Sequence, residues 1–312
     1  MVKNKPINLV PFRHLYPFQS HYMKLGTSLQ YHYIDEGNGE PVVAVHGNPT
    51  WSFYFRKLIK GLSSSYHIIV PDHIGCGLSE KPGSDRYPYT LKNRVDNLEE
   101  FICRLGINTG ITLVGHDWGG MIAMAYALRN PGRIARIVLM NTAAFHPPHL
   151  GTQRKKLPLR LALVRNFTLL SKPAVQGLNL FAYAALYMAS AKKLPQAVRT
   201  GLIAPYNSWS NRVAVFNFVR DIPMKPEDPS YALVRATDSG LSNLSHLPML
   251  ICWGLQDFVF DLAYLNEWRR RFPHAHVHSF ADAGHYILED KPREILFLIK
   301  NFLKNNPVSS CN

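Results

Sequence analysis

Short apolar runs alternate with helical patterns over the first half of the chain. Dense runs rich in Val and Ile, bounded by Gly, Pro or Asp, occur at 41–46, 67–70, 111–114 and 134–140. Such runs are typical of strands that are buried on both faces of a parallel sheet. Residues 28–36 alternate like a half-buried strand, and helical stripes cover 91–105 and 119–128. The pattern predicts an α/β fold, with a mostly parallel central sheet flanked by helices.

The alternation of short apolar runs with helical patterns ends after Phe145. Residues 146–230 contain several prolines and short helical stretches but no clear strand. Strand-like runs return at 248–253 and 276–280, and a helical pattern follows at 293–303. We therefore expect a core of residues 1–145 and 231–312, interrupted by an inserted helical cap, 146–230. The uncharged stretch 173–191 predicts a helix in a hydrophobic lid, with membrane-surface contact as the alternative.

Composition narrows the class of protein. The chain has 312 residues, of which 46% are hydrophobic and 18% charged, which argues against disorder, collagen or a coiled coil. The net charge is +14, and the cap holds twelve Lys or Arg against three acids, or +9. Such a surface is either simply solvated or docks on a membrane or an acidic partner. Nucleic acid is not expected as a partner, because no binding motif accompanies the charge.

Four cysteines lie far apart, at positions 76, 103, 252 and 311, without a C-x-x-C pair. They predict free thiols in a reducing compartment. No apolar segment typical of a secretory signal follows Met1, so we expect a cytoplasmic protein. We expect neither a cofactor nor a metal ion.

The segment Gly115-His116-Asp117-Trp118-Gly119 connects the strand at 111 to the next helix. Strand, tight glycine turn and helix are the context that exposes a nucleophile at the central position. Here that residue is Asp117, whose carboxylate is already ionised at neutral pH and can attack a saturated carbon, forming an ester. A base is then needed to activate whatever resolves the ester. The alternative for Asp117 is a helix N-cap.

His285 follows the last predicted strand, where this architecture places its base. The other interpretation is a surface or core histidine. Asp257, just past the strand at 248–253, would orient His285 and stabilise its charge, with Asp261 as the rival. Either acid could instead be a loop residue or a cap.

Two further residues are candidates for holding a leaving anion. Asn48 follows His46 and Gly47, in the loop that supplies a hydrogen-bond donor in this fold, and its side chain carries an NH2 group. Trp118 adds an indole N–H beside the nucleophile. Such donors suit a halide or a carboxylate. The alternatives are a turn residue and a core tryptophan.

These motifs carry a resemblance. HGNPTW (46–51), PDHIGCGLSEKP (71–82) and GHDWGG (115–120) resemble the haloalkane dehalogenase branch of the α/β-hydrolase superfamily. Epoxide hydrolases share GHDWGG, whereas HGNP favours the dehalogenase branch. Segments 197–223 and 250–290 are similar to the β-lactone decarboxylases of bacterial long-chain olefin biosynthesis. The resemblance to these enzymes extends over nearly the whole chain, including the cap.

The resemblance implies the α/β-hydrolase fold and roles for five residues. Asp117 would be the nucleophile, His285 the general base and Asp257 its acidic partner, with Asn48 and Trp118 at the leaving group. The implied substrate is a cis-β-lactone with two long alkyl chains, converted to a cis-alkene and carbon dioxide. The implied partners are the other enzymes of the pathway in a multienzyme assembly, with peripheral contact at the inner membrane through the basic cap. Apolar cap residues would form a tunnel for this hydrophobic substrate or belong to ordinary core: Leu178, Leu180, Phe181, Tyr183, Leu186, Tyr187 and Met188.

Three alternatives stay open. Hydrolytic dehalogenation of haloalkanes would use the same five residues. An epoxide hydrolase would need cap tyrosines such as Tyr183, Tyr187 or Tyr206 facing Asp117. A non-catalytic ligand-binding protein of this fold is the third, although every catalytic role has a candidate here.

Overall fold

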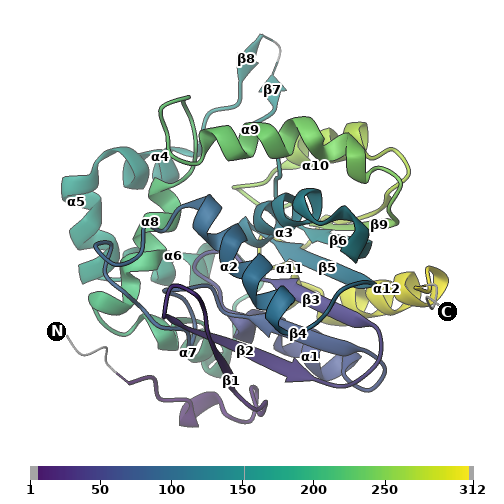
Figure 1. Cartoon of the computed structure of the whole chain (residues 1–312). Coiled ribbons are helices and arrows are strands. Elements are labelled where there is room, and N and C mark those ends of the chain that lie inside the picture. The colour runs from purple at the N-terminus through teal and green to yellow at the C-terminus, as the bar shows by residue number, and fades with distance from the viewer. Residues whose placement is uncertain (1–5, 151, 309–312) are drawn as a thin grey trace.

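A central eight-stranded sheet organises the computed structural model, which describes residues 6–150 and 152–308 (Figure 1). In spatial order the strands are β1 (His21–Lys24), β2 (Gln30–Glu36), β4 (His67–Pro71), β3 (Pro41–Val45), β5 (Ile111–His116), β6 (Ile134–Met140), β9 (Met249–Gly254) and β10 (His276–Phe280). The pairs β1–β2 and β2–β4 are antiparallel, and the remaining pairs are parallel. The predicted α/β class and mostly parallel sheet are confirmed.

Helices cover both faces of this sheet. Alternate residues of the central strands enter two separate cores, so that Val43 packs on one side and Val42 on the other. One core includes residues of α2 (Leu91–Arg104), α3 (Trp118–Arg129), α9 (Tyr231–Gly240) and α10 (Leu262–Arg271). The other includes residues of α1 (Arg56–Leu62), α11 (Ile287–Asp290) and α12 (Pro292–Asn305). This double burial explains why the strands are continuous apolar runs.

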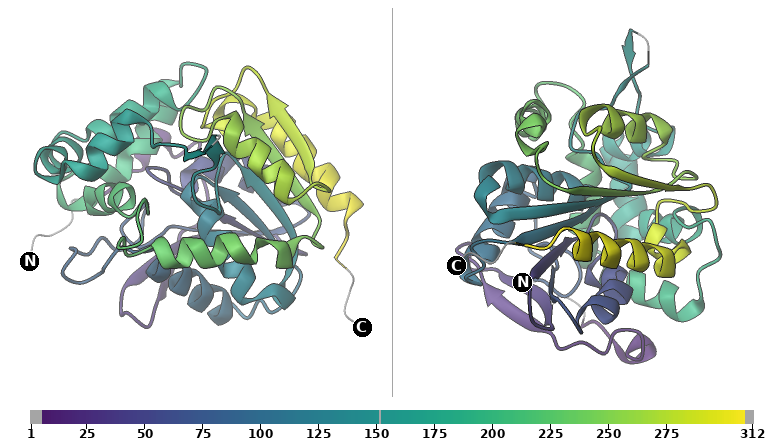
Figure 2. Two further views of the ribbon diagram at one scale, coloured as in Figure 1. Left: turned by 90° about the horizontal axis from the view of Figure 1, so that it is seen from above. Right: turned by 90° about the vertical axis from the view of Figure 1, so that its right-hand side faces the viewer.

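Between β6 and α9 the chain forms a group of short helices beside the carboxyl ends of the strands (Figures 1 and 2). They are α4 (Leu159–Asn166), α5 (Thr168–Lys172), the π-helical turn η4 (Pro173–Gly177), α6 (Leu180–Met188), α7 (Gln196–Ile203) and α8 (Val213–Arg220). We keep 146–230 as the proposed bounds of the cap.

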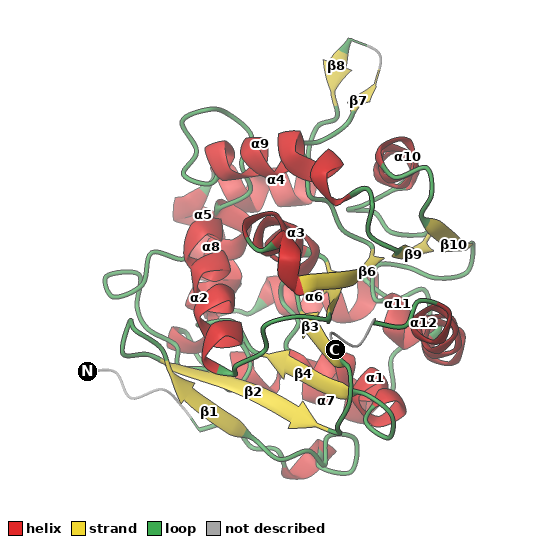
Figure 3. Cartoon of the chain, turned by 45° about the vertical axis from the view of Figure 1, so that its right-hand side comes forward, coloured by secondary structure: helices red, strands yellow, loops and turns green. Residues whose placement is uncertain are grey.

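Two predictions for this segment were wrong. It does contain strands, because β7 (His149–Leu150) and β8 (Gln153–Arg154) pair into a small antiparallel hairpin that projects from the molecule (Figure 3). Two residues per strand are too few to leave an alternating pattern. Residues 173–191 are also not one helix, because Asn179 adopts a left-handed conformation with φ 56° and separates η4 from α6.

Other differences are local. The predicted strand 28–36 begins at Gln30, because Ser28 has φ 61° in the turn that joins β1 to β2. Within the described ranges, Cys76, Cys103 and Cys252 are free thiols, and Cys311 lies outside them. Met1 and the four residues after it also lie outside. In 6–150 and 152–308 we find no helix that combines the length and hydrophobicity needed to cross a bilayer.

Candidate active site

Asp117 lies at the sharp turn between β5 and α3, with φ 53°. The turn depends on glycine at two positions. A Cβ atom at Gly119 would lie 1.8 Å from the carbonyl oxygen of Val45, and one at Gly115 would lie 2.6 Å from the Cα of Gly120. The Asp117 side chain makes no capping hydrogen bond to α3. Asp117 therefore occupies the N-cap position of α3 without capping the helix through its side chain, and its carboxylate lines a cavity.

The carboxylate of Asp117 is buried but hydrogen-bonded. Its Oδ2 accepts the backbone N–H of Asn48 at 2.7 Å, and only 7% of the residue is exposed. Burial raises the pKa of Asp117 from 3.8, against the opposing effects of His285 and of the backbone N–H groups of Asn48 and Trp118. Gly47 is required here as well, because a Cβ atom there would lie 2.1 Å from Oδ2. The site thus tightly fixes one oxygen and leaves the other free to react.

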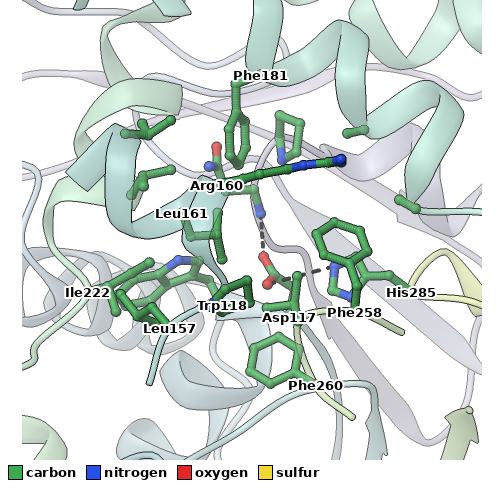
Figure 4. A pocket seen from close by; sticks show the side chains of 18 of the residues that line it. Asp117, Trp118, Leu157, Arg160, Leu161, Phe181, Ile222, Phe258, Phe260 and His285 are labelled. Carbon is green, nitrogen blue, oxygen red and sulfur yellow. Dashed lines mark hydrogen bonds and ion pairs between the residues drawn. The ribbon is translucent and has the colours of Figure 1, made fainter. Parts of the chain in front are cut away.

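His285 faces that second oxygen (Figure 4). Its Nε2 lies 3.8 Å from Oδ1 of Asp117, and its Nδ1 lies 2.7 Å from Oδ2 of Asp257. Burial alone would lower the pKa of His285, but the Asp257 carboxylate, the hydrogen bond to it and the Asp117 charge together raise that pKa from 6.5. The structure therefore brings together the three residues of the predicted order nucleophile, acid and base.

Asp257, and not Asp261, contacts His285. Asp257 is 3% exposed, and its Oδ1 accepts the backbone N–H groups of Val259 and Phe260. Asp261 caps α10 by accepting the N–H of Ala263, and it also pairs with Lys155. The rival acid is thus a helix cap.

Asn48 and Trp118 both line the cavity beside Asp117. The side-chain Nδ2 of Asn48 donates to the carbonyl of Val215 at 3.2 Å, while its Oδ1 is buried without a partner. One of the two amide hydrogens is therefore committed to the cap segment, and one remains for an anion. The Trp118 indole packs edge-on against Phe218, with ring centroids 5.6 Å apart.

A cavity of about 500 Å³ extends from Asp117 between the sheet and the cap helices. Its wall is mainly apolar, and Figure 4 shows Leu161, Phe181, Phe258 and Phe260 around the carboxylate. Of the seven apolar cap residues suggested for a tunnel, Leu180, Phe181 and Met188 line this cavity, and Leu186 is buried in the core. The other three are exposed: Leu178, Tyr183 and Tyr187.

The tyrosines that an epoxide hydrolase would need are placed elsewhere. Tyr183 and Tyr187 are 46% and 66% exposed, and neither lines the cavity. Tyr206 is buried away from the cavity, and its hydroxyl donates to the carbonyl of Thr50 at 3.0 Å. Within the described chain, no group of three or more His, Cys, Asp or Glu side chains is arranged to hold a metal ion.

Asn141 is a site residue that sequence reasoning missed. Its Nδ2 donates to Oδ2 of Asp257 at 2.9 Å and to the carbonyl of Gly254 at 3.0 Å, and its Oδ1 accepts the N–H of Gly254. Its backbone carbonyl accepts the N–H of Asp117 at 3.1 Å. Asn141 thus joins the loop after β6 to both Asp117 and Asp257. Its φ of 34°, which Asn tolerates better than most residues, was not visible from the sequence.

Arg94 was also missed. Its guanidinium pairs with Asp221 at 2.7 Å and stacks over Phe218, with its Cζ 3.7 Å from the ring centroid. The same Cζ lies 5.4 Å from the centre of the Trp118 ring. A buried Arg94–Asp221 ion pair therefore lies behind Trp118 and Phe218, with the guanidinium in cation–π contact with their rings.

Known proteins resemble this chain over most of its length. Residues 40–292 match the family model described as the alpha/beta hydrolase fold. A cis-3-alkyl-4-alkyloxetan-2-one decarboxylase of Shewanella oneidensis is 52% identical, covering 93% of this chain and 89% of the relative. A decarboxylase of the same name from Xanthomonas campestris is 41% identical, covering 88% and 93%.

Haloalkane dehalogenases are more distant. Haloalkane dehalogenase 2 of Mycobacterium bovis is 30% identical, covering 93% of this chain and 96% of the relative. The crystal structure of the haloalkane dehalogenase DatA from Agrobacterium tumefaciens superposes with a TM-score of 0.82 at 23% identity, covering 93% and 97%. The latter likeness supports the fold.

Proposed function

The chain belongs to the alpha/beta hydrolase fold family and, within it, to the family of cis-3-alkyl-4-alkyloxetan-2-one decarboxylases, and on this premise we propose that it converts cis-β-lactones with long alkyl chains into cis-alkenes and carbon dioxide. An oxetan-2-one is a β-lactone, a strained four-membered ring. The observation that carries the proposal is a buried carboxylate, Asp117, that faces a histidine at the base of an apolar cavity of about 500 Å³.

In the first step, Asp117 attacks ring carbon C4. A bond forms between Oδ1 of Asp117 and C4, the bond between C4 and the ring oxygen breaks, and the released electron pair leaves a carboxylate on C3. Attack at the carbonyl carbon would instead give an anhydride and an alkoxide, which offer no direct route to carbon dioxide. Asn48 and Trp118, both at the cavity wall beside Asp117, hold the new carboxylate.

In the second step, the bond between C3 and the carboxylate carbon breaks, and its electrons form the C3–C4 double bond. The C4–Oδ1 bond breaks at the same time, which restores the Asp117 carboxylate. His285, whose Nε2 lies 3.8 Å from Oδ1, assists this departure in its protonated form, which the Asp257 carboxylate favours. Inversion at C4 followed by anti elimination keeps both alkyl groups on the same side, so a cis-lactone gives a cis-alkene.

The second candidate is hydrolytic dehalogenation, favoured by the 30% identity to a haloalkane dehalogenase and by the Asp117 carboxylate at the cavity, which could displace a halide. His285 would then act as general base on water. A side-by-side assay distinguishes the two: purified protein receives either a cis-3,4-dialkyl β-lactone or a panel of bromoalkanes. We expect rapid alkene formation by gas chromatography and slow or no bromide release. Bromide release without alkene would contradict the decarboxylase proposal.

The substrate is small and hydrophobic, which also suggests where the protein works. We propose a cytoplasmic protein that contacts the inner membrane peripherally and assembles with the enzymes that make its lactone. A compound with two long alkyl chains is poorly soluble in water, so short transfer distances favour its turnover. The basic cap supports contact with an anionic surface.

A further inference from the structure

The outer surface of α4, α5 and α6 is unusually apolar. Nine large apolar side chains, each at least 46% exposed, lie between positions 159 and 187: Leu159, Leu163, Phe167, Leu169, Leu170, Leu178, Leu180, Tyr183 and Tyr187. We call them the α4–α6 surface. Leu169 and Leu170, on the short helix α5 at the edge of the molecule (Figure 1), are 90% and 77% exposed. Exposed apolar groups concentrated in this way mark a surface that binds something.

The charges around this surface are all of one sign. Residues 146–220 contain eleven Lys or Arg and no Asp or Glu. Arg160 and Lys172 lie on α4 and α5, and Lys192 and Lys193 follow α6, all four exposed. Three acids follow before position 231: Asp221 and Asp228 form ion pairs with Arg94 and Arg165, and Glu227 is exposed. The surface therefore combines apolar groups with cations and offers no free carboxylate from its own segment.

The combination of exposed apolar side chains and cations indicates which kind of partner this surface binds. A second copy of the chain would place the same cations opposite one another, which disfavours a symmetric dimer through this surface. A bilayer with anionic headgroups satisfies both features, because its phosphates attract Lys and Arg while leucine and tyrosine side chains enter the apolar layer.

The cavity opens at the same place. Arg160, Leu180 and Phe258 line the cavity and are also exposed, so they mark its mouth. Figure 4 shows Arg160 and Phe258 on either side of the space that contains Asp117. The mouth is thus bordered by α4 and α6, the helices that carry the apolar groups.

We propose that the α4–α6 surface inserts into an anionic phospholipid bilayer and that the substrate enters the cavity directly from the acyl layer. The first half assigns the peripheral membrane contact proposed above to a defined surface, and the second half rests on the proposed decarboxylation. A lipid-soluble lactone then passes from bilayer to Asp117 without crossing water.

Vesicle flotation of the purified chain tests the docking. We expect binding to vesicles of phosphatidylcholine with phosphatidylglycerol and much weaker binding to phosphatidylcholine alone. The double variant L169S/L170S should bind at least about a hundredfold more weakly, since two buried leucines together contribute roughly 3 kcal/mol or more. Lys172→Gln should weaken binding about five-fold, because a basic residue near the surface contributes about 1 kcal/mol.

Matched controls lie on α12. Phe297 is 63% exposed, and Lys300 is exposed nearby, so Phe297→Ser and Lys300→Gln should leave flotation unchanged. Wild-type protein that stays unbound with phosphatidylglycerol vesicles would overturn the proposal, as would equal binding by L169S/L170S. A wild-type dimer in sedimentation that L169S/L170S dissociates would show instead that copies of the chain cover this surface.

Assays of alkene formation distinguish delivery of the lactone from the bilayer from the chemical steps at Asp117. L169S/L170S should lose alkene formation from a long-chain lactone dissolved in vesicles but keep the wild-type rate on a short, water-soluble lactone. Equal loss on both substrates would overturn delivery from the bilayer. Absence of alkene from both substrates with wild-type protein would contradict the proposed function, while flotation would still decide the docking.

Discussion

Replacing His285 by Gln should stop the reaction after Asp117 has opened the ring. Gln retains much of the side-chain volume, but it removes the positive charge that faces Oδ1 of Asp117. At the observed separation of 3.8 Å, a unit charge acts on a carboxylate with about 4 kcal/mol at an effective dielectric constant of about 20. Because this stabilisation is gained only as Asp117 departs, ester breakdown should slow by a factor on the order of 10³.

The trapped ester has a distinctive mass. Protein mixed with a β-lactone and quenched in acid should gain the full mass of the lactone, because neither carbon dioxide has left nor water been added. The assay is run at alkaline pH, since loss of His285 would raise the pKa of Asp117 further. The double variant D117N/H285Q should show no adduct, and its melting curve reports whether the fold is intact.

Three results would refute this reasoning. Lost turnover without any adduct would mean that His285 acts before the covalent step or that no ester forms. An adduct located by peptide mapping on a residue other than Asp117 would assign the nucleophile elsewhere. Unchanged alkene formation by His285→Gln would remove the histidine from the mechanism.

Three further predictions concern the same residues. The pKa of His285 is raised from 6.5, and single-turnover breakdown of the lactone-derived ester to alkene should decline as pH rises through that higher value, because protonated His285 is lost. Hydrolysis of a bromoalkane-derived ester needs neutral His285 and should instead increase over the same pH range. Stopped-flow pH profiles measure both rates. Asp257→Asn should lower kcat at least about a hundred-fold, while Asp261→Asn, which preserves a capping residue, should stay within about twofold in steady-state assays. Asn141→Leu should remove the acceptor of the Gly254 N–H and one of the two donors to the Gly254 carbonyl, costing about 2 kcal/mol in urea unfolding, and should also lower kcat.

The sequence predictions were accurate where a feature leaves a pattern over several neighbouring residues. The central strands were recognised because both of their faces are buried, which requires nearly every residue to be apolar. The turn at Asp117 was recognised because its glycines are neighbours in sequence. The β7–β8 hairpin and the break at Asn179 depend on one or two residues and left no periodic pattern.

Other features could not be predicted because they depend on contacts between residues far apart in the sequence. Asn141 contacts Gly254 and Asp257, more than a hundred positions away, and nothing near Asn141 indicates that role. The choice between Asp257 and Asp261 similarly required the fold, because both follow β9 in one loop. Only the folded chain shows that Asp261 caps α10 and that Asp257 meets His285.

The decarboxylation and dehalogenation candidates differ in their need for water more than in their residues. Both begin with an ester on Asp117, but a haloalkane ester has no internal route of release and must wait for water. The lactone-derived ester carries its own leaving group, the carboxylate on C3, so its breakdown needs no second molecule. Phe260 stacks beside His285, with ring centroids 5.9 Å apart, and the polar groups that could hold a water molecule in this apolar cavity include His285 Nε2 and the buried Oδ1 of Asn48. Hydrolysis therefore depends on a water molecule held at these two groups, whereas loss of carbon dioxide does not, and the same five residues can release a lactone-derived ester without it.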